Sequence, residues 1–332
     1  MPKPVVGITL GDPGGIGPEV IVKTLSSLQF SGFHPVLFGV PEVLQPLKKK
    51  MNAGKIGFCD ISGEASRLFL NHSKKGSRSG RLSVVPGKIS LSNACISHAS
   101  LEIAARAACQ GKLQAIVTAP VNKTAMRLVD PDFYGHTEYL AGVSGVKKFA
   151  MMFVAPRLKV TLVTIHVPVR QVSALIQKNL VFEKIKLTHD FLRRYFRISK
   201  PRLAVCALNP HGKETGSEDE AEIRPAVLQA RRVGISAEGP LPGDQVFYDA
   251  YHGRFDAVVS MYHDQGLAPF KMIAFRGGVN VTLGLPFVRT SPDHGTAFDI
   301  AYQGKADPVS FQSALSLAVQ FVSNKRPNHF DF

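Results

Sequence analysis

Short apolar runs alternate along this chain with segments whose apolar residues recur at helical spacing. The first run, Val5–Leu10, is followed by a glycine-rich turn and by a helical pattern from about Pro18 to Leu28. We expect further strands at His34–Gly39, Ala115–Thr118, Lys159–Ile165, Arg202–Leu208 and Ala257–Met261, and further helices at Leu101–Cys109 and Ser310–Val322. Strands that alternate with helices in this way indicate an α/β fold with a largely parallel sheet.

The composition is that of an ordinary globular protein, with 45% hydrophobic and 20% charged residues among 332. This length favours about two domains. No apolar run approaches the roughly 18 residues of a membrane span, and the N-terminal run is too short for a signal peptide. None of the four cysteines forms a CxxC pair, which argues against a zinc ribbon or a disulfide framework. We therefore expect a cytoplasmic protein with reduced thiols and no membrane partner.

The formal net charge of +15 fits either a nucleic-acid-binding protein or an enzyme for anionic substrates. The basic residues are dispersed. Their densest runs, Lys48–Lys50 and Arg193–Arg194, do not lie in an aromatic-rich RNA-binding signature. We therefore expect a small anionic substrate and no nucleic acid, with a non-catalytic basic anion- or nucleic-acid-binding protein as the alternative of a different class.

Three histidines follow expected strands by a few residues: His166, His211 and His263. Ligands of α/β sheets bind beyond the carboxyl ends of the strands. Three neutral imidazoles can hold a catalytic metal and leave coordination positions open for a substrate. The alternative for any one of them is a polar cap on its strand. The shared placement favours a metal site, and a fourth strand end carries Lys123 in the cluster TAPVNK.

Two further groups of residues suggest contacts with an anion. His136 and Thr137 follow a glycine, and an imidazole, a hydroxyl and a backbone amide at a helix start can hold a phosphate or carboxylate. The alternative is a simple helix cap by Thr137. Lys271, Asn280 and Arg289 lie in an otherwise apolar, glycine-rich region and form a plausible anion clamp.

Two loops give less specific evidence about structure and function. The turn Gly11–Glu19 matches neither a Walker A motif nor a full GxGxxG, so both a tight structural turn and a phosphate cradle stay open. Residues 63–83 are rich in Ser, Lys and Gly, and we expect a surface excursion there.

Seven strings, in this order, resemble the PdxA family of 4-hydroxythreonine-4-phosphate dehydrogenases: GDPGGIGPE, TAPVNK, GHTE, LNPH, MYHDQG, GGVNVTLGLPFVRTS and DHGTAFDIA. The resemblance covers residues 5–322. It implies two α/β/α domains similar to isocitrate and isopropylmalate dehydrogenases, with the active site in the cleft between them. The first domain would comprise residues 1–125 plus 286–332, with a cofactor loop near 293–308. The second, 126–285, would carry the metal ligands and the dimer interface.

The resemblance also implies roles for single residues. His166, His211 and His263 would bind a divalent Zn, Mg or Co ion in a homodimer, with His166 coming from the partner subunit. The phosphorylated substrate would contact His136, Thr137, Lys271, Asn280 and Arg289. Asp244 and Asp264 lie in motifs near the metal, and either would orient a histidine or relay a proton.

The segment 293–301 is similar to the adenosine-binding loop of isopropylmalate dehydrogenases, which places His294, Gly295, Thr296 and Asp299 at the cofactor. A carboxylate at Asp299 would hold ribose hydroxyls and repel a 2′-phosphate. This favours NAD, with NADP as the alternative.

The activity that the resemblance implies is the NAD-dependent oxidation of 4-hydroxy-L-threonine 4-phosphate to 2-amino-3-oxo-4-phosphooxybutanoate. This product would lose CO₂ to give 3-amino-2-oxopropyl phosphate, a step of pyridoxal 5′-phosphate biosynthesis. The alternative within the family is a paralogue that acts on D-threonate or D-erythronate 4-phosphate or on another hydroxy acid.

Overall fold

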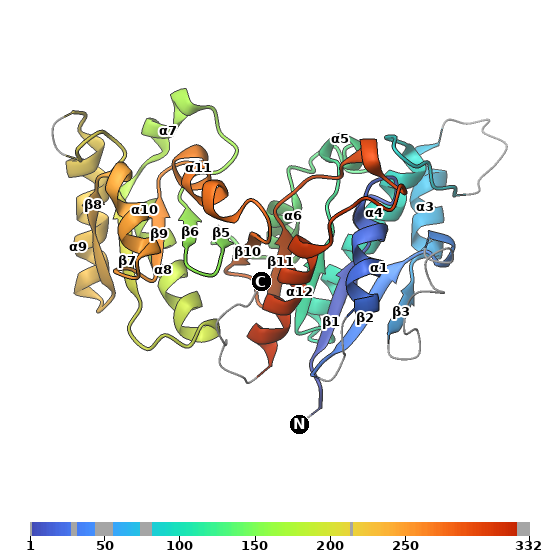
Figure 1. Ribbon diagram of the computed structural model, residues 1–332. Helices are drawn as coiled ribbons and strands as arrows, with labels where there is room; N and C mark the ends of the chain where they lie inside the picture. The colour runs from blue at the N-terminus through green and yellow to red at the C-terminus, as the bar shows by residue number, and fades with distance from the viewer. Residues whose placement is uncertain (1, 28–31, 44–55, 74–81, 213–214, 324–332) are drawn as a thin grey trace. The chain divides into compact units, whose positions relative to one another are not determined.

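The computed structural model describes residues 2–27, 32–43, 56–73, 82–212 and 215–323, and they form two compact units (Figure 1). Unit 1 comprises residues 1–146 and 285–325, and unit 2 comprises residues 147–284. Each unit is a sheet packed with helices, which confirms the expected α/β class. The domain division expected near residue 125 stays a prediction. The compact units place residues 126–146 in unit 1, where they include a helix that packs on another helix of that unit.

Unit 1 is built on a parallel sheet with the strand order β3-β2-β1-β4-β11. Its strands are β1 (Val5–Thr9), β2 (His34–Gly39), β3 (Gly57–Asp60), β4 (Ala115–Thr118) and β11 (Val288–Pro292). Its helices are α1 (Gly17–Ser27), α3 (Ser62–His72), α4 (Leu91–Cys109), α5 (Lys123–Met126), α6 (His136–Val143), the 3₁₀ turn η3 (Phe298–Ile300) and α12 (Val309–Val322).

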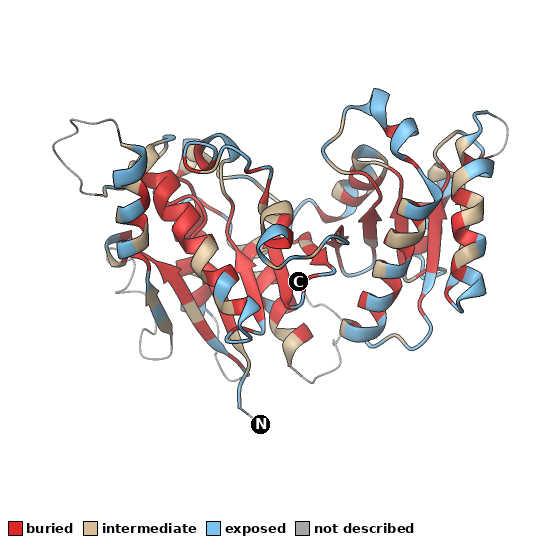
Figure 2. Cartoon of the chain, turned by 180° about the vertical axis from the view of Figure 1, so that it is seen from behind, coloured by how far each residue is buried: buried red, intermediate tan, exposed pale blue. Residues whose placement is uncertain are grey.

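The central strands of unit 1 are buried on both faces. Every residue of β4 and β11 is buried, which is the pattern of strands covered by helices in a parallel sheet. Helix α4 packs against β1, β2 and β4, while α12 packs against β4 and β11. Figure 2 shows the buried residues gathered on the strands and on the helix faces next to them. The carboxyl ends of β4 and β11 are therefore held firmly, and both carry candidate site residues.

Unit 2 has the strand order β10-β5-β6-β9-β7-β8. Strand β5 is antiparallel to both of its neighbours, and the remaining pairs are parallel. The strands are β5 (Ala150–Val154), β6 (Lys159–Leu162), β7 (Arg202–Cys206), β8 (Ser236–Leu241), β9 (Ala257–Ser260) and β10 (Val279–Leu283). The helices are α7 (Val169–Leu175), α8 (Lys178–Tyr195), the π-helical turn η2 (Asp219–Ile223), α9 (Arg224–Arg232), α10 (Gly243–Tyr251) and α11 (His263–Ala274).

One expectation from the sequence needs correction. The first part of segment 63–83 is not a surface excursion, because α3 spans Ser62–His72 and packs on α4. Its buried residues, Ala65 and Leu68, lie three apart and therefore share a helix face. Residues 74–81 of the segment, and the basic run Lys48–Lys50, lie outside the described residues. Among the described helices, none has the length and apolar character needed to cross a membrane.

Candidate functional site

The first candidate group lies at the start of α6 in unit 1. Gly135 precedes the helix, and His136 and Thr137 form its first turn. The Thr137 residue is only 2% exposed. The first backbone amides of a helix have no partners within it, and together with the helix dipole they favour an anion. The predicted helix start is therefore present, and Thr137 is too buried to be an ordinary surface cap.

Arg289 lies on β11, next to β4, and is a buried cation with an exposed fraction of 3%. Its Nη2 and Nε atoms donate to the hydroxyl oxygen of Thr118 at 2.8 and 3.2 Å. Burial lowers the pKa of Arg289 to about 10, and the carboxylate of Glu138 acts in the opposite direction. The guanidinium is thus charged at neutral pH, and the nearby Glu138 carboxylate favours this charged form.

His136 stands beside two positive charges. Its Nε2 atom is fully buried and has no hydrogen-bond partner among the described residues. Burial, and then the positive charges of Arg289 and Lys123, hold the pKa of His136 well below 6.5. The imidazole is therefore neutral at pH 7, and its unsatisfied Nε2 can bind an incoming polar ligand. We call His136, Thr137 and Arg289 the anion cradle.

The glycine-rich turn after β1 is a structural element of unit 1. Gly11 has φ +66°, and a Cβ added to it would lie 2.4 Å from the carbonyl oxygen of Pro120. Asp12 is fully buried, and its Oδ1 accepts a hydrogen bond of 2.9 Å from the amide of Gly14. Burial raises the pKa of Asp12 to about 6, although the Gly14 hydrogen bond acts to lower it. An acid buried in this way argues against a phosphate cradle at this turn, because like charges repel.

The same turn supports the expected cofactor loop. The Ile16 amide donates to the carbonyl oxygen of Thr296 at 2.9 Å. A Cβ added to Gly15 would lie 2.6 Å from that oxygen, so only glycine permits this approach. Of the two interpretations left open by the sequence, these contacts favour a structural turn.

The cofactor loop itself presents polar groups from unit 1. The Nδ1 atom of His294 lies 3.0 Å from the carbonyl oxygen of Gly295, while its buried Nε2 has no hydrogen-bond partner among the described residues. Asp299 and Gly295 are exposed. An exposed carboxylate and a buried, unsatisfied imidazole nitrogen are groups that ribose and adenine can use.

In unit 2, two of the three predicted metal ligands come together. The chain beyond β6 runs beside the chain beyond β9, because Thr164 donates to the carbonyl oxygen of Met261 through both its amide (3.1 Å) and its hydroxyl (2.8 Å). The rings of His166 and His263, two residues further on in each segment, have centroids 6.0 Å apart. The parallel pairing of β6 and β9 thus explains this approach.

His263 is oriented by its neighbour. Its Nδ1 lies 2.7 Å from Oδ1 of Asp264, a contact in which the carboxylate accepts a hydrogen bond when the proton is on Nδ1. The Nε2 atom then carries the lone pair that a metal ligand requires. Of the two candidate carboxylates, Asp264 therefore has a visible contact with a candidate ligand. Asp244 is exposed in the first turn of α10.

His211 lies in the loop that follows β7, and the sequence does not reveal what holds this loop in place. The residue is exposed and has φ 59°, in the left-handed region. Buried Asp219 holds the loop, since its carboxylate accepts from the amides of Leu208 (2.7 Å) and Asn209 (3.1 Å) and from Asn209 Nδ2 (2.9 Å). Asp219 stands in the acidic run SEDEAE, where nothing in the sequence distinguishes it from its neighbours.

The candidate histidine ligands of unit 2 form only part of a site for a divalent metal. Among the described residues, no three His, Cys, Asp or Glu side chains form a group that could hold a metal ion. His166 and His263 are brought together, and His211 is not gathered with them into such a group. Two imidazoles, one of them oriented by a carboxylate, are suitable ligands for a transition metal.

Two predicted substrate contacts lie in unit 2. Lys271 is half-buried on α11, and its Nζ lies 5.6 Å from the ring centroid of Phe275. Asn280 is on β10, and its Oδ1 is buried without a hydrogen-bond partner among the described residues. An orphaned amide oxygen of this kind is costly in a finished fold, and a bound ligand would satisfy it.

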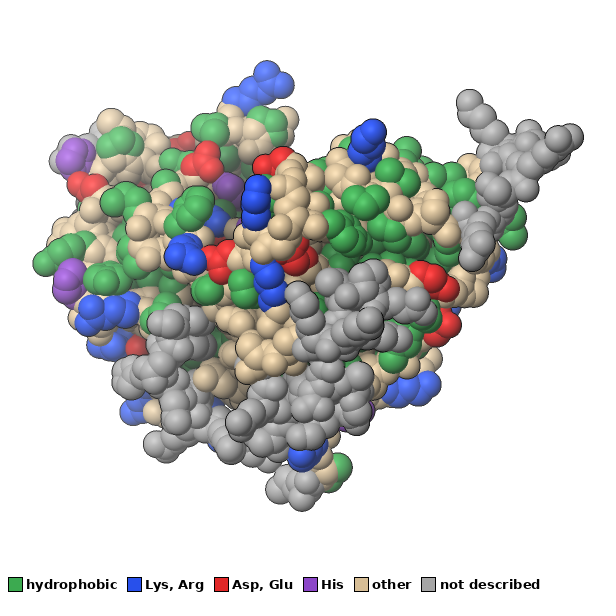
Figure 3. All heavy atoms as spheres, turned by 45° about the vertical axis from the view of Figure 1, so that its right-hand side comes forward, with side chains coloured by type: hydrophobic (Ala, Val, Ile, Leu, Met, Phe, Trp, Pro, Cys, Tyr) green, Lys and Arg blue, Asp and Glu red, His purple; other side chains and the backbone are tan. Residues whose placement is uncertain are grey.

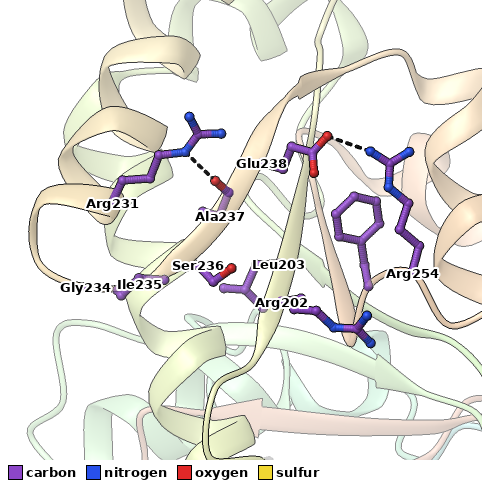
Figure 4. Close-up of a pocket in the computed structure, with 10 residues that line it drawn as sticks. Arg202, Leu203, Arg231, Gly234, Ile235, Ser236, Ala237, Glu238 and Arg254 are labelled. Carbon is purple, nitrogen blue, oxygen red and sulfur yellow. Dashed lines mark hydrogen bonds and ion pairs between the residues drawn. The ribbon is translucent and has the colours of Figure 1, made fainter.

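A hollow of about 530 Å³ in unit 2 lies apart from these residues (Figure 4). It is at the amino ends of β7 and β8, whereas the candidate residues follow carboxyl ends. Its arginines are held in its wall: Arg202 pairs with Asp256, Arg254 pairs with Glu238, and Arg231 donates to a backbone carbonyl. We assign these side chains a structural role. On the face drawn in Figure 3, basic side chains are interspersed with acidic and hydrophobic ones.

Known proteins resemble the whole chain. The family model described as Pyridoxal phosphate biosynthetic protein PdxA matches residues 32–318. The 4-hydroxythreonine-4-phosphate dehydrogenase of Desulforapulum autotrophicum is 41% identical over 338 aligned positions, and the alignment covers 95% of each chain. The D-threonate 4-phosphate dehydrogenase of Salmonella typhimurium is 39% identical over 328 residues, covering 97% of this chain and all of the other.

A crystal structure of 4-hydroxythreonine-4-phosphate dehydrogenase from Klebsiella pneumoniae superimposes with a TM-score of 0.78 at 33% identity, covering 96% of this chain and 99% of that chain. Two different phosphorylated four-carbon acids thus appear in the names of similar proteins.

Proposed function

The chain belongs to the PdxA family, and from this premise we propose that it is an NAD-dependent dehydrogenase of 4-hydroxy-L-threonine 4-phosphate. The reaction moves a hydride from C3 of the substrate to NAD⁺ and releases the proton of the C3 hydroxyl. The resulting β-keto acid, 2-amino-3-oxo-4-phosphooxybutanoate, then loses CO₂ to give 3-amino-2-oxopropyl phosphate. The observation that carries the proposal is the anion cradle of unit 1.

The cradle supports a phosphorylated substrate for an electrostatic reason. Arg289 is buried and charged, and its guanidinium donates to the neutral hydroxyl of Thr118. His136 is neutral and has an unsatisfied Nε2. A phosphate can accept from the guanidinium, from the imidazole and from the first amides of α6, and charge-assisted hydrogen bonds of this kind are among the strongest available to a protein. In unit 2, we propose that Lys271 and Asn280 contact the same substrate.

We propose that His166, His211 and His263 hold a divalent cation, with Zn, Mg and Co as candidates. Such a cation would lower the pKa of a substrate hydroxyl. The chain's own part is to present the imidazoles: Asp264 keeps the Nε2 lone pair of His263 available. Asp264 and Asp244 are also our candidates for accepting the hydroxyl proton.

The loop that carries His294, Gly295, Thr296 and Asp299 is our proposed cofactor site, with NAD preferred to NADP. Its shape is held by the glycine-rich turn through the Ile16–Thr296 hydrogen bond. The exposed Asp299 carboxylate would accept hydrogen bonds from ribose hydroxyls and would repel a 2′-phosphate.

We further propose that the enzyme is a homodimer in which His166 serves the partner's metal site. The support is the end of α11, where Met272 is 89% exposed and Phe275 is 78% exposed. Large apolar side chains exposed together mark an interaction surface. They follow on the same helix from His263, so a second copy seated there would lie near the proposed metal ligands.

A second substrate is favoured by a specific observation. The D-threonate 4-phosphate dehydrogenase of Salmonella typhimurium is nearly as similar to this chain as the 4-hydroxythreonine-4-phosphate enzyme of Desulforapulum autotrophicum. The two acids share the phosphate, the carboxylate and the C3 hydroxyl and differ at C2, which bears an amine or a hydroxyl. The cradle serves both equally.

One assay tests these alternatives. NADH formation is followed with 4-hydroxy-L-threonine 4-phosphate, D-threonate 4-phosphate and D-erythronate 4-phosphate, with NAD⁺ or NADP⁺ and with or without a chelator. The proposal expects the highest kcat/KM with the first substrate and NAD⁺, and loss of the signal on chelation. A higher kcat/KM with a threonate or erythronate phosphate would establish the paralogue. No NADH with any substrate, together with salt-dependent DNA binding, would favour the non-catalytic alternative.

A further inference from the structure

We propose that Lys123 is an additional substrate ligand, whose ammonium group completes the anion cradle and makes it select a doubly charged phosphate over a singly charged carboxylate. This inference rests on the proposed function, since it concerns the anion that the cradle binds. It assigns a role to the lysine of the TAPVNK cluster, which none of the roles described above uses.

The local fold fixes the backbone position of Lys123. Lys123 is the first residue of α5, and Asn122 caps this short helix by accepting from the amide of Ala125 at 2.9 Å. The cluster follows directly from β4, whose last residue, Thr118, holds the Arg289 guanidinium. The same strand end thus positions Lys123 and supports the buried cation of the cradle.

The side chain of Lys123 runs alongside the start of α6. A Cβ built on Gly135 would lie 3.8 Å from Cε of Lys123. This is an ordinary van der Waals distance, and Oε2 of Glu138 lies nearer to the same point, at 2.8 Å. The lysine stem and the Glu138 carboxylate therefore both lie beside the first turn of the helix. Lys123 is an exposed residue, so its ammonium group is accessible to a ligand that arrives from solvent.

Charge supports the same assignment. The positive charge of Lys123 acts on His136 and helps to keep its imidazole neutral. The Glu138 carboxylate lies in the same region, and its charge acts on Arg289. Arg289 and Lys123 with Glu138 leave one net positive charge around a neutral histidine. Without Lys123, Arg289 and Glu138 would leave no net charge there, so Lys123 supplies the positive charge that attracts a dianion more strongly than a monoanion.

The simpler alternative is a solvated surface lysine whose charge is screened from any ligand. The two alternatives differ in the anion that they affect. Removing a screened lysine would weaken the binding of no anion in particular. A ligand lysine strengthens the binding of a dianion more than that of a monoanion, because the Coulomb energy is proportional to the product of the charges.

The test uses full-length Lys123→Met and Lys123→Arg proteins, with Lys112→Met as a control that removes the same charge from another exposed lysine of unit 1. Inorganic phosphate and acetate are titrated as probes, and the imidazole signals of His136 are followed by NMR. We expect Lys123→Met to raise the Kd of phosphate about tenfold and that of acetate about threefold at most, from the usual strength of a hydrogen bond to a charged group. Lys123→Arg should stay within about threefold of the wild type, and Lys112→Met should match it.

The free proteins give a second readout. In Lys123→Met the pKa of His136 should rise, because a neighbouring positive charge has been removed, and Lys112→Met should leave it unchanged. An unchanged phosphate affinity in Lys123→Met, or equal losses for phosphate and acetate, would overturn the inference. If NADH still forms with a phosphorylated substrate, only the role of Lys123 has failed. If the wild type neither binds phosphate nor forms NADH, the proposed function has failed with it.

Discussion

The buried guanidinium of Arg289 donates two hydrogen bonds to the neutral hydroxyl of Thr118. Replacing Thr118 with Val keeps the shape of the side chain and removes this acceptor. We expect the KM for the phosphorylated substrate to rise about tenfold, because a hydrogen bond to a buried charge contributes about 1.5–3 kcal/mol and also directs the guanidinium. Steady-state kinetics of Thr118→Val measure this effect. Thr118→Ser retains the hydroxyl and should stay close to the wild type, and an equal loss in both variants would contradict the argument.

Asp12 is a buried acid whose burial works against its ionised form. Its pKa is raised to about 6 from 3.8, so the folded state holds a proton that the unfolded state releases as the pH rises from 4 to 6. Its contribution to stability is therefore favourable below pH 4 and is lost as the pH passes 6. Asp12→Asn should stabilise the protein at pH 7.5 by roughly 3 kcal/mol and have little effect at pH 4.

Thermal unfolding of Asp12→Asn at pH 4 and at pH 7.5 tests this dependence. The asparagine can still accept the Gly14 amide, whereas Asp12→Ala cannot and serves as the control that removes both the charge and the hydrogen bond. A melting temperature that rises equally at the two pH values would show that the charge of Asp12 is not responsible.

Single residues of the candidate site differed in how far the sequence could reveal them. The histidines after β6 and β9 were predicted from their place beyond strands, and His166 and His263 do lie together. Thr118 also ends a predicted strand, but a threonine in a strand is ordinary, so nothing marked it as the support of Arg289. The pairing of β4 with β11 joins residues about 170 positions apart, and no local pattern carries that information.

At the scale of elements, the loop between β7 and η2 depends on one carboxylate. Asp219 accepts from two backbone amides and one side-chain amide of the segment that leads to His211. In Asp219→Asn, an amide nitrogen would face these donors, so we expect a loss of about 2 kcal/mol in the free energy of unfolding. Denaturant unfolding measures this change.

If the proposed metal site is correct, Asp219→Asn should also weaken metal binding, because the loop that presents His211 loosens. Competition with a chromogenic chelator measures that affinity. Glu220→Gln is the matched control: Glu220 is exposed and pairs with Arg224, so its loss should cost less than about 0.5 kcal/mol. Metal affinity that stays at the wild-type value in Asp219→Asn would argue against this role for the loop.

The elements themselves were predicted well where their apolar runs were long and framed by turns. The strands β1, β2, β4, β6, β7 and β9 were each expected close to their observed places. Strands β10 and β11 do not stand out in the sequence, since their polar residues and Gly284 hide the periodicity of this glycine-rich region. Helix α3 was missed because its sequence, SGEASRLFLNH, is polar and buries only two side chains. Packing on α4 stabilises helix α3, whose own composition does not predict a helix.

At the scale of the whole molecule, the exposed end of α11 predicts self-association. Met272→Glu combined with Phe275→Glu should convert the proposed dimer into monomers, because charges at an apolar interface lose their hydration without gaining partners. Analytical ultracentrifugation reads the change in mass, and catalytic activity should fall with it. Leu70→Glu, at a leucine that is 63% exposed on α3, is the control and should leave the assembly intact. A double variant that sediments like the wild type would place the interface elsewhere.

The pairing of β11 with β4 has a consequence for biosynthesis. When β4 leaves the ribosome its neighbour β1 has already emerged, but β11 follows about 170 residues later, which at 5–20 residues per second is a delay of roughly 10–30 seconds. During that interval one edge of a buried strand is open to other nascent chains. Unit 2 emerges meanwhile and can fold as the first completed half, so the N-terminal part of the protein is the last to be finished.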